Sequence, residues 1–486
     1  AVGEDPFFGG ANPPNNNLGL LAGGPNPGIF ETLTRLTPTY GIGPGLAQGW
    51  EAPTPTNWRF TLRPGVRFHN GAPLDAAAVV AFFDGLGNTR LRGLERGGST
   101  AAGDLVVEVT LTLPNSRLAE QLANPSLGVR APGTVAGPGD DPARTPTGTG
   151  PFRFVSYSRG AQLRVEPFAE YWGDQALLRS LTFRFGAERD ASRLLATRQV
   201  ELVGQIPYGS IANVSGRTDR LVTSRPGRSL YLLLNIGGVD EWATLKDENL
   251  RRAVALALDR TTLTKSAFGE LAEPSRTLVL EPALGPSAER VRAPGTDERT
   301  AARLLEDAGW RRATDGVRTR DGQPLVLRLI LSQPAEQAEV GALIRAQLAQ
   351  VGVGVEIVDP APDTPFVRIN QSTFHLYLDV RAQDDANPCN LCRFFTIRPG
   401  GSLPFAGSVG AGQDGDNLFE LLHSTGPIDG ARRLAADLMN IVTTERILAI
   451  PLAGLRSAWV VSPRVRGFDP APLGGDQRWD AVWLAA

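Results

Sequence analysis

Residues 325–358 join two strand patterns to a helical pattern between them, and this stretch limits the fold more than any other. "LVLRLIL" (325–331) is a continuous apolar run typical of a buried strand, and "VGVEIV" (353–358) alternates apolar and polar side chains. Between them, apolar side chains recur at helical spacing, at Val340, Leu343, Ile344, Leu348 and Val351. This order predicts a βαβ unit, in which two parallel strands are joined by a right-handed crossover.

The rest of the chain adds shorter signals of the same mixed kind. "NWRFTLRPGVRF" (57–68) alternates on both sides of a Pro-Gly pair, which predicts a β-hairpin. Asp75 precedes an apolar run at 76–86 and is a suitable N-cap for a helix there. Residues 104–112 alternate like a strand, and residues 249–260 and 298–310 have amphipathic helical patterns. We therefore expect an α/β fold in more than one lobe.

Length and charge exclude several classes of protein. A chain of 486 residues is long enough for about two or three domains with their own cores. Its net charge of -2 gives no reason to expect nucleic acid and no Lys/Arg run stands out, so we expect no nucleic-acid partner. No stretch approaches the roughly 18–20 apolar residues that span a bilayer. Because the chain begins at Ala1 without a leader, we interpret it as a processed form or one whose targeting segment was removed.

The chain carries few signals of catalysis. Metalloprotease, P-loop and serine-hydrolase motifs are missing from the sequence. The three histidines, His69, His375 and His423, stand without motif partners, so we expect structural roles for them. We expect no cofactor and no bound metal, and we predict that the protein is not an enzyme.

Several segments together resemble family 5 of the extracellular solute-binding proteins, the dipeptide-, oligopeptide- and nickel-binding receptors of ABC importers. A Gly-Thr-Gly-Pro-Phe stretch at 148–152 leads to Tyr-Trp-Gly at 171–173, and "RRAVALALDR" (251–260) is similar to a helix of the family. The resemblance covers nearly the whole chain in the expected order, in segments 29–86, 148–173, 232–274, 301–310 and 447–468.

This resemblance implies a two-lobed periplasmic-binding-protein fold of type II, with an extra subdomain in lobe I and hinge closure over a cleft between the lobes. Lobe I would comprise 1–40, 150–235 and 460–486, the subdomain 41–149 and lobe II 236–459. It also implies an exported protein in the periplasm or at the cell surface, without a catalytic step of its own. Such a protein acts as a monomer with the membrane permease subunits of an importer.

The resemblance also points to ligand-binding residues around "VRAQDDANPCNLCRFF" (380–395). In peptide-binding members, an Asp that holds the ligand's amino group aligns with Asp384, and a Trp aligns with Arg381. We therefore expect Asp384 to bind an ammonium group and Arg381 to favour a carboxylate. The alternative is that Asp384 and its neighbour Asp385 are solvated loop acids.

Four further arginines are candidates by position in the family, where arginines contact anionic groups of the ligand. Arg90 and Arg92 follow the predicted helix at 76–86, Arg130 lies in "SLGVRAP", and Arg368 lies in "PFVRIN". For each of them the alternative is a solvated surface arginine.

The only two cysteines of the chain form a Cys389-x-x-Cys392 pair in the same region. A zinc site needs about four ligands, and no second Cys/His cluster would complete one. The surroundings do not resemble a thioredoxin-like redox motif. In an exported protein, a local disulfide that rigidifies the loop is favoured, with two buried thiols as the alternative.

We therefore predict a receptor that captures a short peptide or an amino-acid-derived zwitterion. An anionic metal–metallophore or opine-like compound is the second possible ligand, favoured by Arg90, Arg92, Arg130 and Arg381. A hydrolase acting on a small molecule in the cleft is the alternative from another class.

Overall fold

The fold is described from a computed structural model. The residues that it describes are 28–37, 39–86, 91–133, 146–158, 161–185, 191–204, 219–358, 368, 371–383, 385–396, 410–472 and 477–485.

The βαβ unit predicted from the sequence is present. Strand β16 (Val326–Leu331) is followed by helix α9 (Pro334–Gln350) and strand β17 (Gly354–Val358). The two strands pair in parallel, with Leu327 opposite Val355 and Leu329 opposite Ile357. The parallel pairing and the α/β class are thus confirmed.

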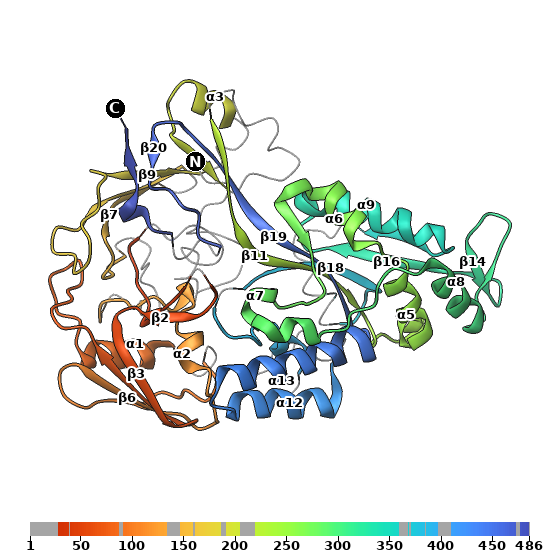
Figure 1. The fold of residues 1–486 in the computed structure, drawn as a ribbon, viewed down its shortest axis with the longest axis horizontal. Coiled ribbons are helices and arrows are strands. Elements are labelled where there is room, and N and C mark those ends of the chain that lie inside the picture. Colours follow the sequence, from red (N-terminus) through yellow and green to blue (C-terminus); the bar gives the residue numbers. More distant parts are fainter. Residues whose placement is uncertain are drawn as a thin grey trace.

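This unit is one edge of a larger central sheet with the strand order β10-β19-β11-β18-β16-β17, in which β12 also pairs with β19. The added strands are β10 (Leu202–Gly204), β11 (Arg220–Leu234), β12 (Ala272–Pro274), β18 (Leu376–Ala382) and β19 (Ala449–Val461). Strands β11 and β19 are the longest of these, and they pair antiparallel over most of their length. In Figure 1 they run from the upper left of the molecule into its right half, so they connect its two halves.

Alternation along β11 divides the helices into two layers. Leu230, Leu232 and Leu234 point into a core formed with α5, α6, α8 and α9. Tyr231 and Leu233 point into a second core on the opposite face, formed with α7, α12 and α13. The helices are α5 (Glu248–Leu256), α6 (Arg260–Phe268), α7 (Glu281–Leu284), α8 (Glu298–Asp307), α12 (Gly412–Ser424) and α13 (Ile428–Asn440).

The pairing of β11 with β19 is irregular near its middle. The register shifts between Thr223 and Pro226 and again between Pro226 and Arg228. Pro226 has no N–H to give to the ladder, and its carbonyl accepts a hydrogen bond from the Tyr40 hydroxyl. A Cβ atom at Gly227 would lie 1.8 Å from the carbonyl oxygen of Pro472, so this position requires glycine.

A separate sheet with the order β3-β4-β6-β5 lies at the lower left of Figure 1 and packs against α1. Its core includes Phe60 of β4, Val107 of β6 and Phe83 of α1. The elements are β3 (Ala47–Thr54), β4 (Asn57–Leu62), α1 (Ala76–Leu86), β5 (Ser99–Ala101), β6 (Val106–Thr110) and the short helix α2 (Leu118–Gln121).

One expectation for this sheet is confirmed and one is wrong. Asp75 caps α1, since its Oδ1 accepts a hydrogen bond from the Ala78 N–H at 2.8 Å. The hairpin predicted at 57–68 is not formed, because β4 pairs with β3 and β6 instead. Only the first arm of the predicted hairpin is a strand of the sheet.

A third group of strands lies at the upper left of Figure 1, near the end of the chain. The sheet β7-β8-β9 and the pair β20-β21 share a core that contains Phe152, Phe183, Trp459 and Trp479. The strands are β7 (Phe152–Ser158), β8 (Gln162–Pro167), β9 (Leu181–Arg184), β20 (Val465–Arg466) and β21 (Trp483–Leu484). Further elements are β1 (Thr34–Leu36), β2 (Ile42–Pro44), α3 (Ala191–Ala196), β13 (Arg311–Arg312), β14 (Arg318–Arg320) and β15 (Gln323–Pro324).

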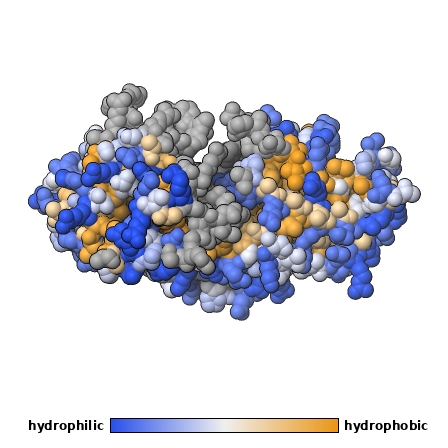
Figure 2. Space-filling view, turned by 90° about the horizontal axis from the view of Figure 1, so that it is seen from above, coloured by the Kyte–Doolittle hydropathy of each residue, from blue (hydrophilic) through white to orange (hydrophobic). Residues whose placement is uncertain are grey.

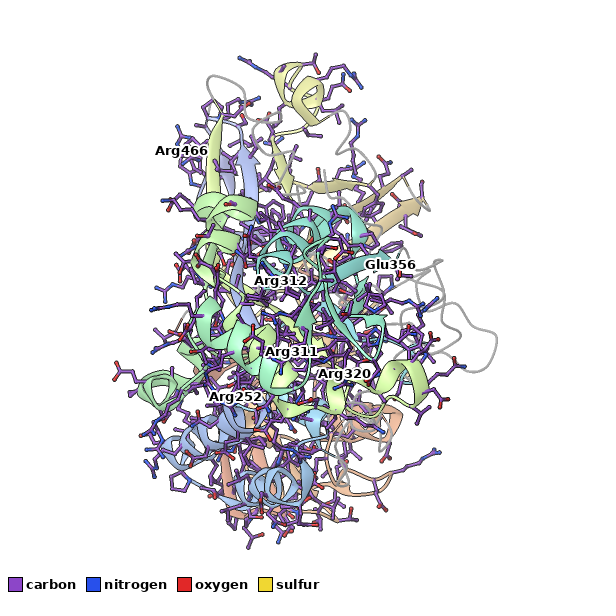
Figure 3. The ribbon with its side chains drawn as sticks, turned by 90° about the vertical axis from the view of Figure 1, so that its right-hand side faces the viewer. Arg252, Arg311, Arg312, Arg320, Glu356 and Arg466 are labelled. Carbon is purple, nitrogen blue, oxygen red and sulfur yellow. A yellow bond between two sulfur atoms is a disulfide. The ribbon has the colours of Figure 1, made fainter. Side chains whose placement is uncertain are left out.

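One face of the molecule is mixed in hydropathy. Figure 2 shows hydrophilic side chains over much of one face, with smaller apolar groups between them. In Figure 3, Arg311, Arg312 and Arg320 lie at the end of the molecule that carries β13 and β14. Two of them are held locally, because Arg312 donates to the Gln350 carbonyl and Arg320 to the Ala308 carbonyl. Within the described ranges, no helix has the length and apolar character needed to cross a bilayer.

A carboxylate holds together the segments around the β7-β8-β9 sheet. Glu31 accepts hydrogen bonds from the Thr149 hydroxyl at 2.9 Å, the Tyr171 hydroxyl at 2.9 Å and the Trp172 indole N–H at 3.0 Å. Burial raises the pKa of Glu31 to about 7, although the three hydrogen bonds favour its charged form and oppose the rise.

This raised pKa predicts that Glu31 makes the protein less stable as the pH increases. The folded state takes up a proton below pH 7, whereas the unfolded chain does so only below its ordinary value of 4.5. The stabilisation is therefore complete below pH 4.5 and is lost as the pH rises to about 7, by at most about 3 kcal/mol.

Urea unfolding of the wild type and of Glu31→Gln, from pH 5 to pH 8, measures this contribution. An amide in this position can still accept from Thr149 and Trp172 and can donate to the Tyr171 hydroxyl. We expect the stability of the variant relative to the wild type to increase with pH. Two parallel stability profiles would contradict the assignment.

Candidate functional site

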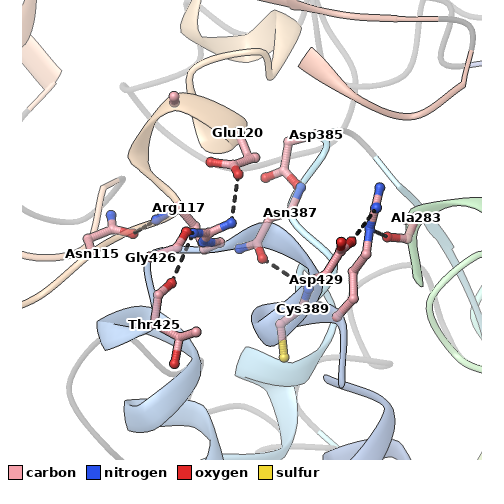
Figure 4. A network of polar contacts seen from close by, with 12 residues as sticks. Asn115, Arg117, Glu120, Ala283, Asp385, Asn387, Cys389, Thr425, Gly426 and Asp429 are labelled. Atoms are coloured by element: carbon pink, nitrogen blue, oxygen red, sulfur yellow. Dashed lines mark hydrogen bonds and ion pairs between the residues drawn. The ribbon is translucent and has the colours of Figure 1, made fainter. Parts of the chain in front are cut away.

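The region around the end of β18 contains the cysteine pair and most of the residues singled out from the sequence. Asp384 lies outside the described residues. The loop that follows is stabilised by its own side chains, as Figure 4 shows in part. Asp385 Oδ1 accepts from the Asn387 N–H at 2.9 Å, and Asn387 Oδ1 accepts from the Cys389 N–H at 2.9 Å. Asp385 is therefore a buried residue that shapes the loop, 7 % exposed.

A disulfide joins Cys389 and Cys392 within this loop. Both cysteines are buried and belong to the core formed with α7, α12 and α13. Phe394, in the 3₁₀ turn Cys392–Phe395, packs in the same core. The disulfide thus fixes the loop that follows β18 against the core formed with α7, α12 and α13, to which Phe394 also belongs.

Arg381 is held by an acid two residues earlier on the same strand. Its Nε donates to Asp379 Oδ2 at 2.8 Å, and the Tyr231 hydroxyl donates to the same oxygen at 3.0 Å. The guanidinium also lies over the Phe394 ring, 5.1 Å from its centroid. Asp379 is 2 % exposed, so this is an ion pair with one almost completely buried partner.

The electrostatics of this cluster follow from burial and charge. Burial by itself would lower the pKa of Arg381, but the negative charge of Asp379 outweighs it and raises that pKa. Burial also raises the pKa of Tyr231 well above its ordinary value, and the neighbouring Asp379 adds to the effect. Arg381 therefore remains a cation and Tyr231 a neutral hydrogen-bond donor.

A second buried arginine lies beside α2. Arg117 donates from Nη1 to Glu120 at 2.8 Å, and from Nη2 to the carbonyls of Thr425, at 3.0 Å, and Gly426. Burial raises the pKa of Glu120, while the positive charge of Arg117 opposes the rise. Figure 4 shows these groups together with the loop of Asp385, Asn387 and Cys389.

The other predicted arginines lie in different settings. Arg92 Nη2 donates to Glu420 Oε2 at 2.5 Å, and its charge is therefore compensated by an acid on α12. Arg130 lies over the Phe30 ring, 5.3 Å from its centroid. Arg368 is half-buried, and Arg90 lies outside the described residues. The structure thus brings Arg381 and Asp385 into one region and puts Arg92 into a separate contact with α12.

Sequence reasoning missed the acids that accompany these arginines, and also Arg117. The Asp379-x-Arg381 spacing was a usable signal, because residues two apart on a strand point to the same face. Glu420 and Arg92 carried no such signal, since they are 328 positions apart. In the part of the chain that the structure describes, no group of three or more His, Cys, Asp or Glu side chains is arranged to hold a metal.

Comparison with known proteins identifies the group to which this architecture corresponds. Residues 41–400 match the family described as "Bacterial extracellular solute-binding proteins, family 5 Middle". Protein XP55 of Streptomyces lividans is 27 % identical over 445 residues, covering 89 % of this chain and 75 % of its own. The glutathione-binding protein GsiB of Pectobacterium atrosepticum is 28 % identical over 305 residues, covering 61 % of this chain and only 56 % of its own.

Solved structures give the same result for the fold. NikA from Brucella suis, in complex with Fe(III)-EDTA, superposes with a TM-score of 0.80 and covers 94 % of both chains at 21 % sequence identity. This likeness confirms the type II periplasmic-binding-protein fold that the sequence predicted.

The Asp379–Arg381 pair makes a prediction about stability. Asp379→Asn leaves a largely buried guanidinium without its anionic partner, so we expect a loss of about 2–3 kcal/mol. Tyr231→Phe removes a single hydrogen bond to the same oxygen, and we expect it to cost about 1 kcal/mol. Urea unfolding measures both values.

A double-mutant cycle of Asp379→Asn with Arg381→Gln is the control. If the two single losses simply add in the double variant, the ion pair does not exist as described.

Proposed function

The chain belongs to family 5 of the bacterial extracellular solute-binding proteins, and on this premise we propose that it is the substrate-binding receptor of an ABC importer. The match over residues 41–400 is the observation that carries the proposal. The receptor captures a solute outside the cytoplasm and delivers it to the permease subunits in the membrane. It acts as a monomer.

Capture in this proposal occurs between two lobes that close over the ligand. Lobe I comprises 1–40, 150–235 and 460–486, with a subdomain at 41–149, and lobe II comprises 236–459. With these bounds the chain crosses into lobe II directly after β11 and returns within β19. The register between the two strands is irregular at Thr223–Arg228, and this supports the strand pair as the part that bends on closure, because few ladder bonds need to change there.

The ligand that we propose is a short peptide or an amino-acid-derived zwitterion. Asp384 binds its ammonium group, and Arg381, Arg130 or Arg368 binds a carboxylate. The name of one relative, a glutathione-binding protein, supports this class, because glutathione is a small peptide with free carboxylates. A charge-assisted hydrogen bond of this kind contributes about 1.5–3 kcal/mol.

An anionic metal–metallophore or opine-like compound is the second candidate. The specific observation in its favour is that the NikA structure from Brucella suis holds Fe(III)-EDTA, an anionic chelate. Arg90, Arg92, Arg130 and Arg381 would then provide the positive charge. The compensation of Arg92 by Glu420 and of Arg381 by Asp379 favours the zwitterion instead.

Native mass spectrometry of the purified protein, followed by denaturation, tests the proposal by identifying any solute that co-purifies. We expect a released peptide or amino-carboxylate, and Asp384→Asn should then weaken its binding by about 10- to 100-fold. A released metal chelate would overturn the zwitterion assignment.

The matched control is Asp385→Asn, one position further along. Its amide oxygen can still accept the hydrogen bond from Asn387, so we expect at most a small change in affinity. Equal losses in the two variants would mean that loop structure, and not an ammonium contact at Asp384, sets the affinity.

Binding without turnover separates a receptor from the hydrolase alternative. The family consists of solute-binding proteins, and we propose that this chain likewise has no chemistry of its own. The identified solute is incubated with the protein and then analysed by chromatography. We expect the solute to be unchanged, whereas the appearance of product would support the hydrolase.

A further inference from the structure

The subdomain contacts lobe II through two arginines that we group as the clasp. It consists of Arg92 and Arg117 on the subdomain side and of Glu420, Thr425 and Gly426 at the end of α12. In Figure 1 the short helix α2, next to Arg117, lies close to α12 and α13 at the bottom of the molecule. The clasp is separate from the strands β11 and β19, through which the chain passes between the two halves.

Arg117 binds the C-terminal end of a helix. Helix α12 ends at Ser424, and Thr425 and Gly426 follow with carbonyls that both accept from Arg117 Nη2. A cation is favourable here, because the last carbonyls of a helix lack intrahelical partners and carry its negative dipole end. Nη1 of the same guanidinium donates to Glu120. The subdomain thus supplies both an arginine that caps a helix of lobe II and the acid that orients it.

Arg92 forms an ion pair across the same boundary. Its side chain is 4 % exposed and that of Glu420 is 33 % exposed, with 2.5 Å between Nη2 and Oε2. Arg92 Nε donates to the Pro114 carbonyl at 3.0 Å, which orients the guanidinium from within the subdomain. The group also lies 5.6 Å from the centroid of the Phe419 ring on α12. A pair this enclosed is screened less by salt than a surface pair.

His423 lies between these two contacts without adding charge to them. Its carbonyl accepts from the Ser116 N–H at 2.6 Å, so the backbone also crosses the boundary here. Burial lowers the pKa of His423 and the charges of Arg92 and Arg117 add to the decrease, so that the pKa is about 4 although the hydrogen bond to the Phe419 carbonyl opposes the change. The histidine is therefore neutral near pH 7 and does not repel the arginines.

The two sides of the clasp have distinct apolar cores. The core of the subdomain is built from side chains of the β3-β4-β6-β5 sheet and α1. The core beneath α12 is built from α7, α12, α13 and one face of the central sheet. The clasp between them consists of ion pairs and hydrogen bonds, which is typical of surfaces that separate without unfolding either side.

We infer that the clasp holds lobe II against the subdomain in the absence of ligand, so that the receptor is mainly closed before it binds. This inference rests on the proposed function, which supplies the two lobes and their closure. A receptor with a populated closed state binds its solute more tightly, because less of the binding free energy is spent on closing it. The clasp therefore sets the affinity from a place that does not contact the solute.

Small-angle X-ray scattering on ligand-free protein tests this inference. The protein is unfolded in guanidinium chloride, dialysed to remove any bound solute, refolded, and compared with protein that was never unfolded. We expect the wild type to keep the same radius of gyration after this treatment. Glu420→Gln should shift the ratio of open to closed molecules by about tenfold and increase the radius of gyration.

Glu166→Gln is the matched control. Glu166 pairs with Arg153 at 2.6 Å and its side chain is 36 % exposed, close to that of Glu420, but Glu166 and Arg153 both lie in the β7-β8 hairpin. We expect its scattering to match that of the wild type. Arg117→Lys is a second test, because it keeps the charge beside Glu120 but loses the reach to two carbonyls, and it should also open the protein.

Two results would overturn the inference: a ligand-free wild type as expanded as Glu420→Gln, or a Glu420→Gln variant as compact as the wild type. Neither measurement requires a known ligand. The absence of any captured solute would therefore count against the receptor function alone, and the scattering of the clasp variants would still be interpretable.

Discussion

The antiparallel pairing of β11 with β19 is the interaction on which the rest of the structure depends. These strands carry the central sheet, they separate its two helical layers, and they form the passage between the halves of the molecule. Hydrogen bonds along a paired ladder are hard to break one at a time. A strand pair that connects two halves of a molecule therefore bends only where its pairing is already interrupted. The shifts around Pro226 provide that interruption, and the close approach of Pro472 to Gly227 brings a late segment of the chain against it.

The clasp and the strands have complementary roles. The strands allow the two lobes to move relative to each other over a limited range. The contacts of Arg92 and Arg117 favour the closed arrangement within that range. Both arginines are oriented from within the subdomain, by the Pro114 carbonyl and by Glu120. Because these side chains are already ordered, they lose little conformational entropy when they contact α12. Such a contact can therefore stabilise the closed arrangement more than an exposed ion pair does.

Sequence patterns predicted local structure better than they predicted partners. The helical spacing of Val340, Ile344 and Leu348 and the N-cap Asp75 identified α9 and α1, because these signals lie within one element. The alternation at 57–68 revealed which face of β4 is buried but not which strand pairs with it, and the hairpin was wrong for that reason. The fold as a whole followed from resemblance. The arginines were predicted from their positions in the family. Their acidic partners, Asp379 and Glu420, were not predicted, because the pairing is a contact in the folded chain that the sequence does not display.

The pairing of these arginines also affects how fast a solute arrives. Arg92 is compensated by Glu420 and Arg381 by Asp379, so each guanidinium forms a short dipole whose field falls off quickly with distance. Such groups attract an anion little from afar. Under the proposed function, the approach of a solute to Arg381 is therefore governed by diffusion and not by electrostatic steering, and Arg92, which belongs to the clasp, adds no long-range attraction. The association rate should therefore vary little with ionic strength.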